Sequence, residues 1–408
     1  MTTTKNNEHK KLNFSSERDQ SQACLNSAEH EKNQGRKVLN VPNLRFPEFE
    51  GEWEKMRLDA FTERVMRKNK SNQSRLPLTI SAQYGLVDQI TFFNKVVAST
   101  DLSNYYLLKK GEFAYNKSYS SDYPWGAIKR LDNYDQGALS SLYICFAPQD
   151  NVVSDFILQY FESPKWHKGI SEIAVEGARN HGLLNVAVQD FFHTYHYVPK
   201  DKKEQIKISK LLMLLDERIA TQSKIIDKLQ SLIKGIGKQL FMDNQNWRTV
   251  KIGELLRIGN GKDYKHLSIG KIPVYGTGGQ MLLVNDYLYD GESVCIGRKG
   301  TIDTPMFLKG KFWTVDTLFY TYDFKDVLPK FCYYLFLQIN WKLYNEGTGV
   351  PSLSKSTIEN IKVKIPSLEQ QQKICSILDC YEHKTNNEEQ TLELYHSEKQ
   401  YLLRQMFI

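Results

Sequence analysis

Two long stretches of this 408-residue chain, residues 202–241 and 369–407, are copies of each other. They superimpose at a constant offset of 166 positions (371 minus 205). The matching residues are Gln205, Lys207, Ile208 and Leu212 with Gln371, Lys373, Ile374 and Leu378, and, near the far ends, Gln239 and Phe241 with Gln405 and Phe407. This duplication predicts a chain built from two similar structural units.

The segments that precede the two copies also match, and in both of them short β-rich runs alternate with turns and helical pieces. The matching pieces are Trp53–Leu58 with Trp247–Ile252, Gly111–Phe113 with Gly291–Ser293, and Gly182 before Pro199 with Gly349 before Pro366. We therefore expect two globular α+β domains, 41–199 and 247–365, and two helices, 200–246 and 366–408. Residues 1–40 are polar and poor in aromatic residues, which predicts a disordered extension.

Apolar residues in the first helix recur at alternating steps of four and three, which is typical of a coiled-coil seam. The seam consists of Ile208, Leu212, Leu215, Ile219, Gln222, Ile226 and Leu229, and continues through Ile233, Ile236 and Leu240. The second helix carries Ile374, Leu378, Glu388 and Leu392 at matching positions, with a more polar centre. An ordinary two-helix core element is the alternative interpretation, but the duplication favours an intramolecular coiled coil.

Charge and length indicate how the helices pair. Residues 200–241 hold ten Lys or Arg and five acids, whereas 366–408 hold four and seven, so the helices should prefer each other. Forty residues make a rod of about 60 Å, whereas a domain of about 120 residues is only about 35 Å across. The second domain cannot bridge a parallel pair. We expect an antiparallel pair with Gln222 and Glu388 in one central layer, and the two domains in a pseudo-twofold arrangement separated by it.

Several classes of protein are disfavoured by what the sequence lacks. The chain has no apolar run of about 20 residues and no secretory signal near its start, so we expect a cytoplasmic protein without a membrane partner. The six cysteines show no metal-binding spacing and are expected to be buried free thiols, while His193 and His196 are expected to be strand residues. No motif for adenine methylation, phosphate binding or nuclease activity is present, and no catalytic or metal-binding residues are predicted.

Two similar but non-identical domains on a rigid spacer suit the reading of two short signals a fixed distance apart, as on DNA. The sequence also resembles the specificity subunits of type I restriction-modification enzymes. The motifs that carry the resemblance are Pro42–Trp53, Ile80–Leu86, Gly111–Ser118, Glu176–Leu184, Gly347–Ser354 and Ile365–Ile374. Together they run from about residue 40 to the C-terminus.

This resemblance implies a non-catalytic subunit that binds double-stranded DNA with a bipartite site, each globular domain acting as a target-recognition domain for one half. It implies that the helices dock two copies of a DNA adenine methyltransferase subunit, and that ATP-dependent restriction subunits can join. No cofactor is expected on this chain, because S-adenosylmethionine, ATP and Mg would be bound by the partner subunits.

Base edges are read by Arg or Lys at guanine and by Asn or Gln at adenine, and phosphates accept any cation. In the second domain the candidates are Tyr275, Gln280, Arg298, Lys299, Ser352 and Lys355, and in the first domain they are Gln83, Tyr84, Asn116, Lys117, Arg179, Asn180 and His181. The glycine-bracketed Arg179–His181 and Arg298–Lys299 are favoured, and the basic run from Arg64 to Arg75 is a candidate phosphate track. A solvated surface role remains open for each residue.

Two other classes of function are kept. A repeat-built adaptor that binds only proteins through its coiled coil is compatible with the mild net charge of +7 and with the acidic second helix. A stand-alone DNA-modifying enzyme is disfavoured by the missing motifs.

Overall fold

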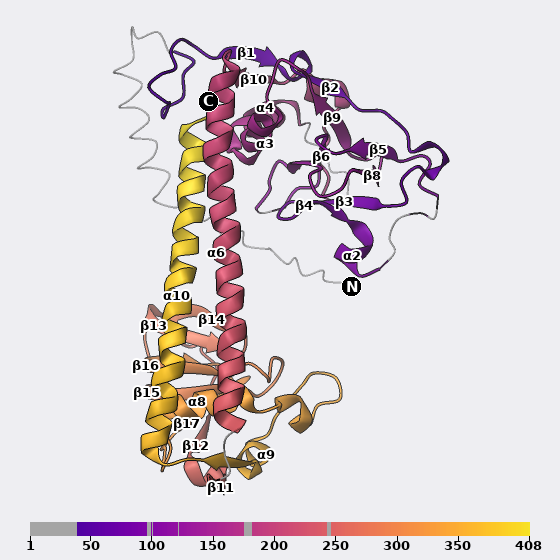
Figure 1. The fold of residues 1–408 in the computed structure, drawn as a ribbon. Coiled ribbons are helices and arrows are strands. Elements are labelled where there is room, and N and C mark those ends of the chain that lie inside the picture. The colour runs from indigo at the N-terminus through magenta and orange to yellow at the C-terminus, as the bar shows by residue number, and fades with distance from the viewer. Residues whose placement is uncertain (1–38, 96–98, 100, 121, 175–181, 243–245) are drawn as a thin grey trace, which may run out of the picture. The chain divides into compact units, whose positions relative to one another are not determined.

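The computed structural model describes residues 39–95, 99, 101–120, 122–174, 182–242 and 246–408. The chain forms two compact units (Figure 1). Unit 1 comprises the residues up to 213 together with 399–408, and unit 2 comprises residues 214–398. No helix in the described ranges is long and apolar enough to cross a membrane.

Each unit combines short helices with β-strands, which confirms the predicted α+β class. Unit 1 contains β1 (Glu54–Arg57), η1 (Leu58–Ala60), β2 (Thr62–Arg64), η2 (Lys70–Asn72), β3 (Pro77–Ser81), β4 (Gly85–Asp88), α2 (Gln89–Phe93), β5 (Tyr106–Lys109), β6 (Phe113–Asn116), β7 (Ala127–Arg130), β8 (Gln136–Leu139), β9 (Ile144–Pro148), α3 (Ser154–Glu162), η3 (Pro164–Trp166), α4 (His167–Ile173), α5 (Val188–Phe192) and β10 (Tyr195–Val198). Unit 2 contains β11 (Arg248–Lys251), α7 (Ile252–Leu255), β12 (Arg257–Asn260), β13 (Ile269–Gly276), β14 (Gly279–Val284), β15 (Tyr289–Gly297), β16 (Met306–Thr314), β17 (Leu318–Tyr322), α8 (Pro329–Gln338), η4 (Trp341–Tyr344), α9 (Lys355–Asn360) and β18 (Lys362–Ile365).

The two units follow the same strand order. Unit 2 has a six-stranded sheet in the order β12-β17-β15-β16-β13-β14, and unit 1 has two four-stranded sheets in the orders β2-β9-β6-β7 and β4-β3-β8-β5. The long hairpin of β15 and β16 corresponds to β5 and β6 paired with β8 and β7, interrupted near Gly111. The outer ladders, β1 with β10 and β11 with β18, are antiparallel in both units. The duplication seen in the sequence is therefore a duplication of topology.

The two long helices are α6 (Lys202–Met242) and α10 (Leu368–Gln405), and each unit contains one end of both. In unit 2 the amide of Gln222 donates to the Glu388 carboxylate at 2.6 Å, while Phe241 shares a core with Ile374 and Leu378. The partner position in α10 thus falls as the position in α6 rises. This confirms the antiparallel direction and the predicted central layer.

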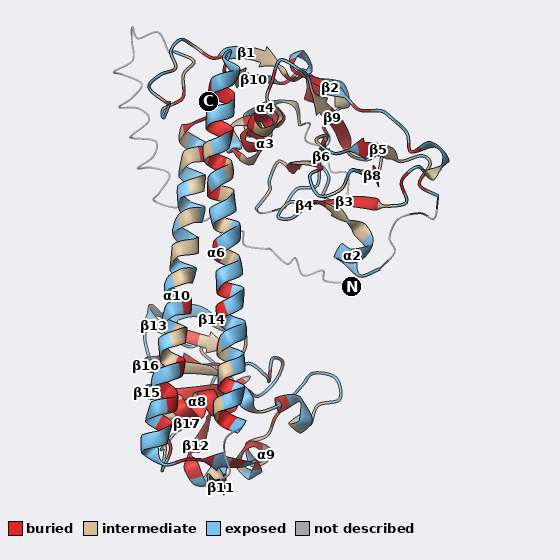
Figure 2. Ribbon diagram, in the orientation of Figure 1, coloured by how far each residue is buried: buried red, intermediate tan, exposed pale blue. Residues whose placement is uncertain are grey.

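The predicted seam residues of both helices are buried or half-buried, whereas most residues between them are exposed (Figure 2). Burial of each such aliphatic side chain contributes about 1.5 to 3 kcal/mol. The polar centre is satisfied by Gln222 with Glu388 and by Gln230 with Glu389. The pseudo-twofold arrangement of the two globular domains stays a prediction.

The repeat extends to individual hydrogen bonds. In unit 1 the buried amide of Gln205 accepts from the backbone N–H of Val153 at 2.8 Å and donates to the Pro199 carbonyl at 2.8 Å. In unit 2 the amide of Gln371 accepts from the N–H of Leu328 at 2.8 Å and donates to the Pro366 carbonyl at 3.1 Å. Each glutamine therefore joins the start of a long helix to the helix that covers the sheet, without leaving a buried polar atom unpaired.

Two sequence expectations need correction. Cys145, Cys295, Cys332 and Cys375 are buried free thiols as expected, but Cys380 is exposed because it lies on the outer face of α10. Burial raises the pKa of Cys145 to about 12. His193 is not a strand residue, since it follows the last turn of α5 and lies 3.9 Å from Asp59. The sixth cysteine, Cys24, and the extension up to residue 38 lie outside the described residues.

His196 predicts that unit 1 loses stability in acid. It is buried in β10 and bonded through its two ring nitrogens to Tyr160 and Thr194, and burial lowers its pKa from 6.5 to about 3. Below about pH 6.5 the His196 imidazole is protonated in the unfolded chain but stays neutral in the folded chain. The free energy of unfolding therefore falls by up to about 1.4 kcal/mol per pH unit until about pH 3. Denaturant unfolding at pH 7 and pH 5 measures this slope. An equal slope in the His196→Phe variant would contradict the assignment.

Candidate nucleic-acid interface

Arg298 and Lys299 lie immediately after β15, where the chain turns out of the sheet of unit 2. Both side chains are exposed, and the Arg298 guanidinium lies 6.0 Å from the centre of the Phe319 ring. Glycines bracket them for a steric reason. A Cβ on Gly297 would lie 2.0 Å from the Thr301 carbonyl oxygen, and Gly300 has a φ of +87°. The turn therefore presents two adjacent cations on a backbone that only glycine permits.

The backbone of residues 298–300 is tied to the loop before α9. Arg298 accepts from the N–H of Leu353 at 2.9 Å, and Gly300 donates to the Pro351 carbonyl at 2.9 Å. Between these bonds, Lys299 forms an isolated antiparallel bridge with Ser352. Arg298 also donates its N–H to Thr317 at 2.8 Å. We call residues 298–300 the tethered loop of unit 2, because its backbone is fixed while the side chains of Arg298 and Lys299 are exposed. The Arg298 guanidinium also donates to the Asp316 carbonyl oxygen at 3.4 Å.

Unit 1 contains the same construction after β6. Lys117 accepts from the N–H of Leu184 at 2.9 Å, and Tyr119 donates to the Gly182 carbonyl at 3.0 Å. Ser118 and Leu183 form the isolated bridge between these bonds. Residues 117–119 are thus the tethered loop of unit 1, and Lys117 and Ser118 occupy the places of Arg298 and Lys299. The two units hold different side chains on one backbone scaffold.

The hairpin of β13 and β14 lies beside the tethered loop of unit 2. Tyr275 and Gln280 are direct strand partners in it, and Tyr275 accepts from the N–H of Val315 at 3.0 Å. A Cβ on Gly300 would lie 3.7 Å from the Thr277 hydroxyl at the hairpin turn. The structure therefore brings five of the six predicted residues of this domain into one loop cluster, namely Tyr275, Gln280, Arg298, Lys299 and Ser352.

Unlike the exposed Arg298 and Lys299, Lys355 is half-buried. Its ammonium donates to the Ile258 carbonyl oxygen in β12 at 2.6 Å and is half-buried. This bond ties α9 to β12, so Lys355 has a structural role, and only its remaining N–H donors are left for a phosphate. The sequence around a lysine does not distinguish a side chain that contacts DNA from one that is bonded to a backbone carbonyl.

The predicted residues of unit 1 are less concentrated. Gln83 and Tyr84 form the exposed turn between β3 and β4, and the Tyr84 ring packs edge-on against Phe92 at 6.3 Å. Asn116 and Lys117 lie at the end of β6, which belongs to the other four-stranded sheet. The Asn116 side chain accepts from the N–H of Ser118 at 3.0 Å and so shapes the tethered loop. The remaining candidates, Arg179, Asn180 and His181, lie outside the described residues.

The basic run divides into engaged and exposed cations. Arg67 donates to both oxygens of Glu112 at 2.7 and 2.8 Å, and Lys68 donates to the Asn104 carbonyl oxygen at 2.8 Å. Arg64, Lys70 and Arg75 are exposed, and Arg64 lines a cavity of about 170 Å³ together with Lys117. A phosphate track over residues 64–75 would therefore rest on these three side chains, since Arg67 is already neutralised.

Sequence reasoning missed two features of the site in unit 2. The carbonyl oxygen of the Asn345 side chain accepts from the N–H groups of Gly347 and Ser352, at 3.0 and 2.9 Å, and so closes the loop that holds residues 298–300. An aromatic row of Tyr289, Tyr320 and Tyr322 crosses β15 and β17, with ring centres 5.5 and 5.8 Å apart. Burial raises the pKa of the Tyr289 and Tyr320 hydroxyls. The signals were an Asn before a Gly-rich turn and the period-two tyrosines of one strand face.

Comparison with known proteins adds family information. Residues 244–394 match the family model described as Type I restriction modification DNA specificity domain. The type I restriction enzyme MjaVIII specificity subunit of Methanocaldococcus jannaschii is 24% identical over 189 residues, covering 40% of this chain and 42% of that protein. The EcoprrI specificity subunit of Escherichia coli is 24% identical over 147 residues, covering 33% and 36%. The chain thus aligns with less than half the length of these curated relatives.

Structural similarity covers more of the chain. The crystal structure of a type I restriction-modification system S subunit from M. genitalium has a TM-score of 0.56 and 18% identity, covering 90% of this chain and 99% of that one. At this identity the match establishes the fold alone. Together with the family match, it confirms the resemblance that the sequence motifs carried.

Proposed function

We propose that this chain, whose residues 244–394 match the family model described as Type I restriction modification DNA specificity domain, is the DNA-recognition subunit of a type I restriction-modification complex. In this proposal each unit reads one half of a bipartite target on double-stranded DNA. The chain itself carries no catalytic centre and positions the subunits that do.

The observation that carries the proposal is the pair of tethered loops. Two backbones held by the same three contacts present Lys117 and Ser118 in unit 1 but Arg298 and Lys299 in unit 2. A fixed scaffold with exchanged side chains suits two readers of different sequence. Arg can bind guanine O6 and N7 with two hydrogen bonds, and the neighbouring Gln280 amide can do the same at adenine.

The partners follow from the same proposal. The exposed faces of α6 and α10 dock two copies of a DNA adenine methyltransferase subunit, and ATP-dependent restriction subunits join that complex. S-adenosylmethionine, ATP and Mg belong to those partners. A solved structure with a TM-score of 0.55 to this chain comes from work on complex assembly in a type I R-M system, which supports a role within an assembly.

Methylome sequencing of cells with and without this chain, each carrying the proposed methyltransferase subunit, tests the proposal. We expect one adenine-methylated motif with two short defined halves and a fixed gap, which disappears when this chain is deleted. Arg298→Ala should relax one position in one half only and cost about 1 to 3 kcal/mol there. A methylome that is identical with and without the chain would reject DNA recognition.

The adaptor alternative makes a different forecast for the purified complex. An adaptor would copurify with the methyltransferase subunit but would not shift DNA that carries the motif. Gel shift at about 150 mM salt separates the two, because affinity at low salt includes nonspecific phosphate contacts. If the complex forms but the methyltransferase subunit alone accounts for all DNA binding, the adaptor function is supported and DNA recognition by this chain is rejected.

A further inference from the structure

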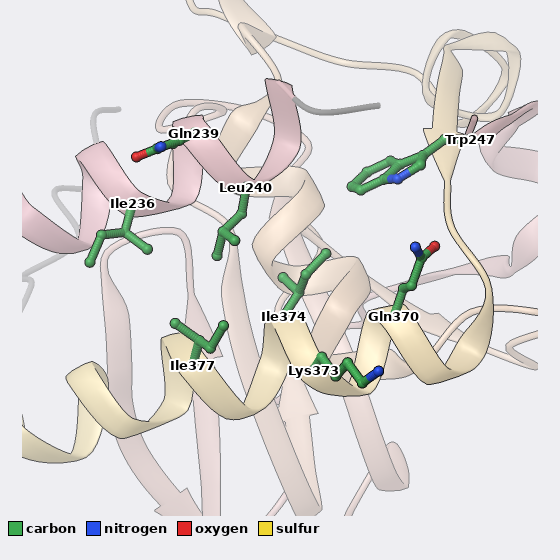
Figure 3. Close-up of a pocket in the computed structure, with 8 residues that line it drawn as sticks. All are labelled: Ile236, Gln239, Leu240, Trp247, Gln370, Lys373, Ile374 and Ile377. Carbon is green, nitrogen blue, oxygen red and sulfur yellow. The ribbon is translucent and has the colours of Figure 1, made fainter. Parts of the chain in front are cut away.

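Unit 2 has an open groove between the end of α6 and the start of α10 (Figure 3). Its volume is about 540 Å³, and it is lined by Ile236, Gln239, Leu240, Trp247, Gln370, Lys373, Ile374 and Ile377. Ile377 is 43% exposed, and the Lys373 side chain is 70% exposed. The indole N–H of Trp247 has no hydrogen-bond acceptor among the residues that the structure describes. The groove is apolar, with one cation and one unpaired donor at its edge.

In unit 1 the repeat-related groove is filled by the chain itself. Asn43 donates its side-chain amide to Gln405, the counterpart of Gln239, at 3.1 Å, and the N–H of Leu44 donates to the Gln405 carbonyl at 3.0 Å. Phe46 packs against the core cluster of unit 1, as do Leu211 and Leu402, the counterparts of Ile377 and Ile236. The filling segment, residues 43–48, is irregular, with bends at Asn43 and Leu44 and a turn at Pro47 and Glu48, and it uses both backbone and side-chain contacts.

Charges hold this segment in place. The Lys207 ammonium, the counterpart of Lys373, lies 4.5 Å from the centre of the Phe46 ring and donates to the Glu48 carboxylate. Glu204, the counterpart of Gln370, accepts from Arg45 at 2.7 and 2.8 Å and from the indole N–H of Trp53 at 3.1 Å. In unit 1 this kind of groove therefore binds an aromatic ring and, two positions later, a carboxylate.

Among the described residues, unit 2 has no matching segment before Trp247. The positions that precede Trp247 as residues 40–48 precede Trp53 are residues 234–242, and these are the last turns of α6. The groove of unit 2 thus keeps an apolar floor, a cation and an indole donor without a described segment that satisfies them as residues 43–48 satisfy their counterparts.

We propose that this groove docks a segment of a partner protein in which an aromatic residue is followed, two positions later, by a carboxylate. The aromatic side chain lies between Ile236 and Ile377, and the carboxylate pairs with Lys373. The Lys373 ammonium is 2.8 Å from Glu369, but this is an exposed pair within one helix and exchanges readily. Gln370 takes the place of Glu204, so the segment needs no arginine to pair with a carboxylate at this position. The segment itself supplies a neutral acceptor for the indole N–H of Trp247.

A second copy of this chain is a poorer occupant. Its own residues 43–48 are held within unit 1 at high effective concentration by the bonds described above. In the groove of unit 2, Arg45 would face Gln370 and would lose its ion pair with the Glu204 carboxylate. A partner segment matched to Gln370 avoids both costs. This inference does not depend on DNA recognition.

The test uses the full chain and a fluorescein-labelled peptide with the sequence of residues 40–52 carrying Arg45→Gln. We expect saturable binding by fluorescence anisotropy, weakened at least tenfold by Lys373→Glu in the chain or by Phe46→Ala in the peptide. A peptide that carries Glu48→Lys should bind the Lys373→Glu chain better than it binds the unaltered chain. Lys384→Glu, on an exposed position of the same helix, is the matched control and should leave binding unchanged.

Each other result would overturn the proposal. Absence of saturable binding to a chain with an unchanged circular dichroism spectrum would remove the groove as a peptide site. Equal binding by the Lys373→Glu chain would place the peptide elsewhere. Concentration-dependent dimerisation of the full chain that Lys373→Glu abolishes would assign the groove to a second copy instead of a partner protein.

Discussion

Replacing Phe407 by alanine should lower the free energy of unfolding of unit 1 by about 3 to 5 kcal/mol, although Phe407 is the penultimate residue of the chain. Its ring is 1% exposed and contacts Phe156, Tyr160 and Trp53 with ring centres 5.5, 5.7 and 6.5 Å away. Truncation leaves a cavity lined by three aromatic rings that rigid helices prevent from collapsing. Denaturant unfolding measures the loss, and hydrogen exchange assigns it to unit 1.

Two variants serve as controls for the Phe407→Ala experiment. Tyr401→Ala removes a ring that is 59% exposed on the same helix and should change stability by less than about 0.5 kcal/mol. Phe241→Ala removes the repeat-related ring, which stacks on Phe331 at 5.2 Å, and should destabilise unit 2. A Phe407→Ala chain as stable as the unaltered one, or one that opens in unit 2, would contradict the duplicated core.

Reversing both charges of the tethered loop in unit 2, by Arg298→Glu with Lys299→Glu, should weaken specific DNA binding about hundredfold, which is about 2.8 kcal/mol. Both side chains are exposed and their backbone is held independently of them, so the fold should be unaffected. Like charges would then face the DNA backbone. Gel shift with the purified complex over a series of salt concentrations measures the affinity, and the salt slope should fall by about 2.

Lys325→Glu is the matched control for this charge reversal. Lys325 is an exposed lysine of the same unit, in the turn after β17, and its backbone N–H is bonded to Leu255. Its reversal should change affinity less than about threefold. If the double variant binds DNA as tightly as the unaltered complex, or if Lys325→Glu weakens binding equally, the tethered loop is not part of the interface.

The residues of the candidate site could be predicted where neighbouring residues in the sequence marked them as exposed. Gly297 and Gly300 around Arg298 and Lys299 indicated an exposed turn, and the structure gives both glycines a steric reason. Lys355 was one of the candidate cations, and its local sequence gives no sign that its ammonium is bonded to the Ile258 carbonyl oxygen, 97 residues away. Likewise, nothing near Arg67 in the sequence predicts that Glu112 neutralises it.

The duplication, the two long helices, their seam and their antiparallel direction could all be predicted from the sequence. These follow from periodicity, from a repeat offset and from the reach of a domain, which are properties of local sequence and chain length. The strand pairing, such as the parallel contacts of β3 with β8 and β13 with β16, and the segment that fills the groove of unit 1 became visible only in the folded chain. Such contacts join distant residues through backbone hydrogen bonds and shape, and neither leaves a period in the sequence.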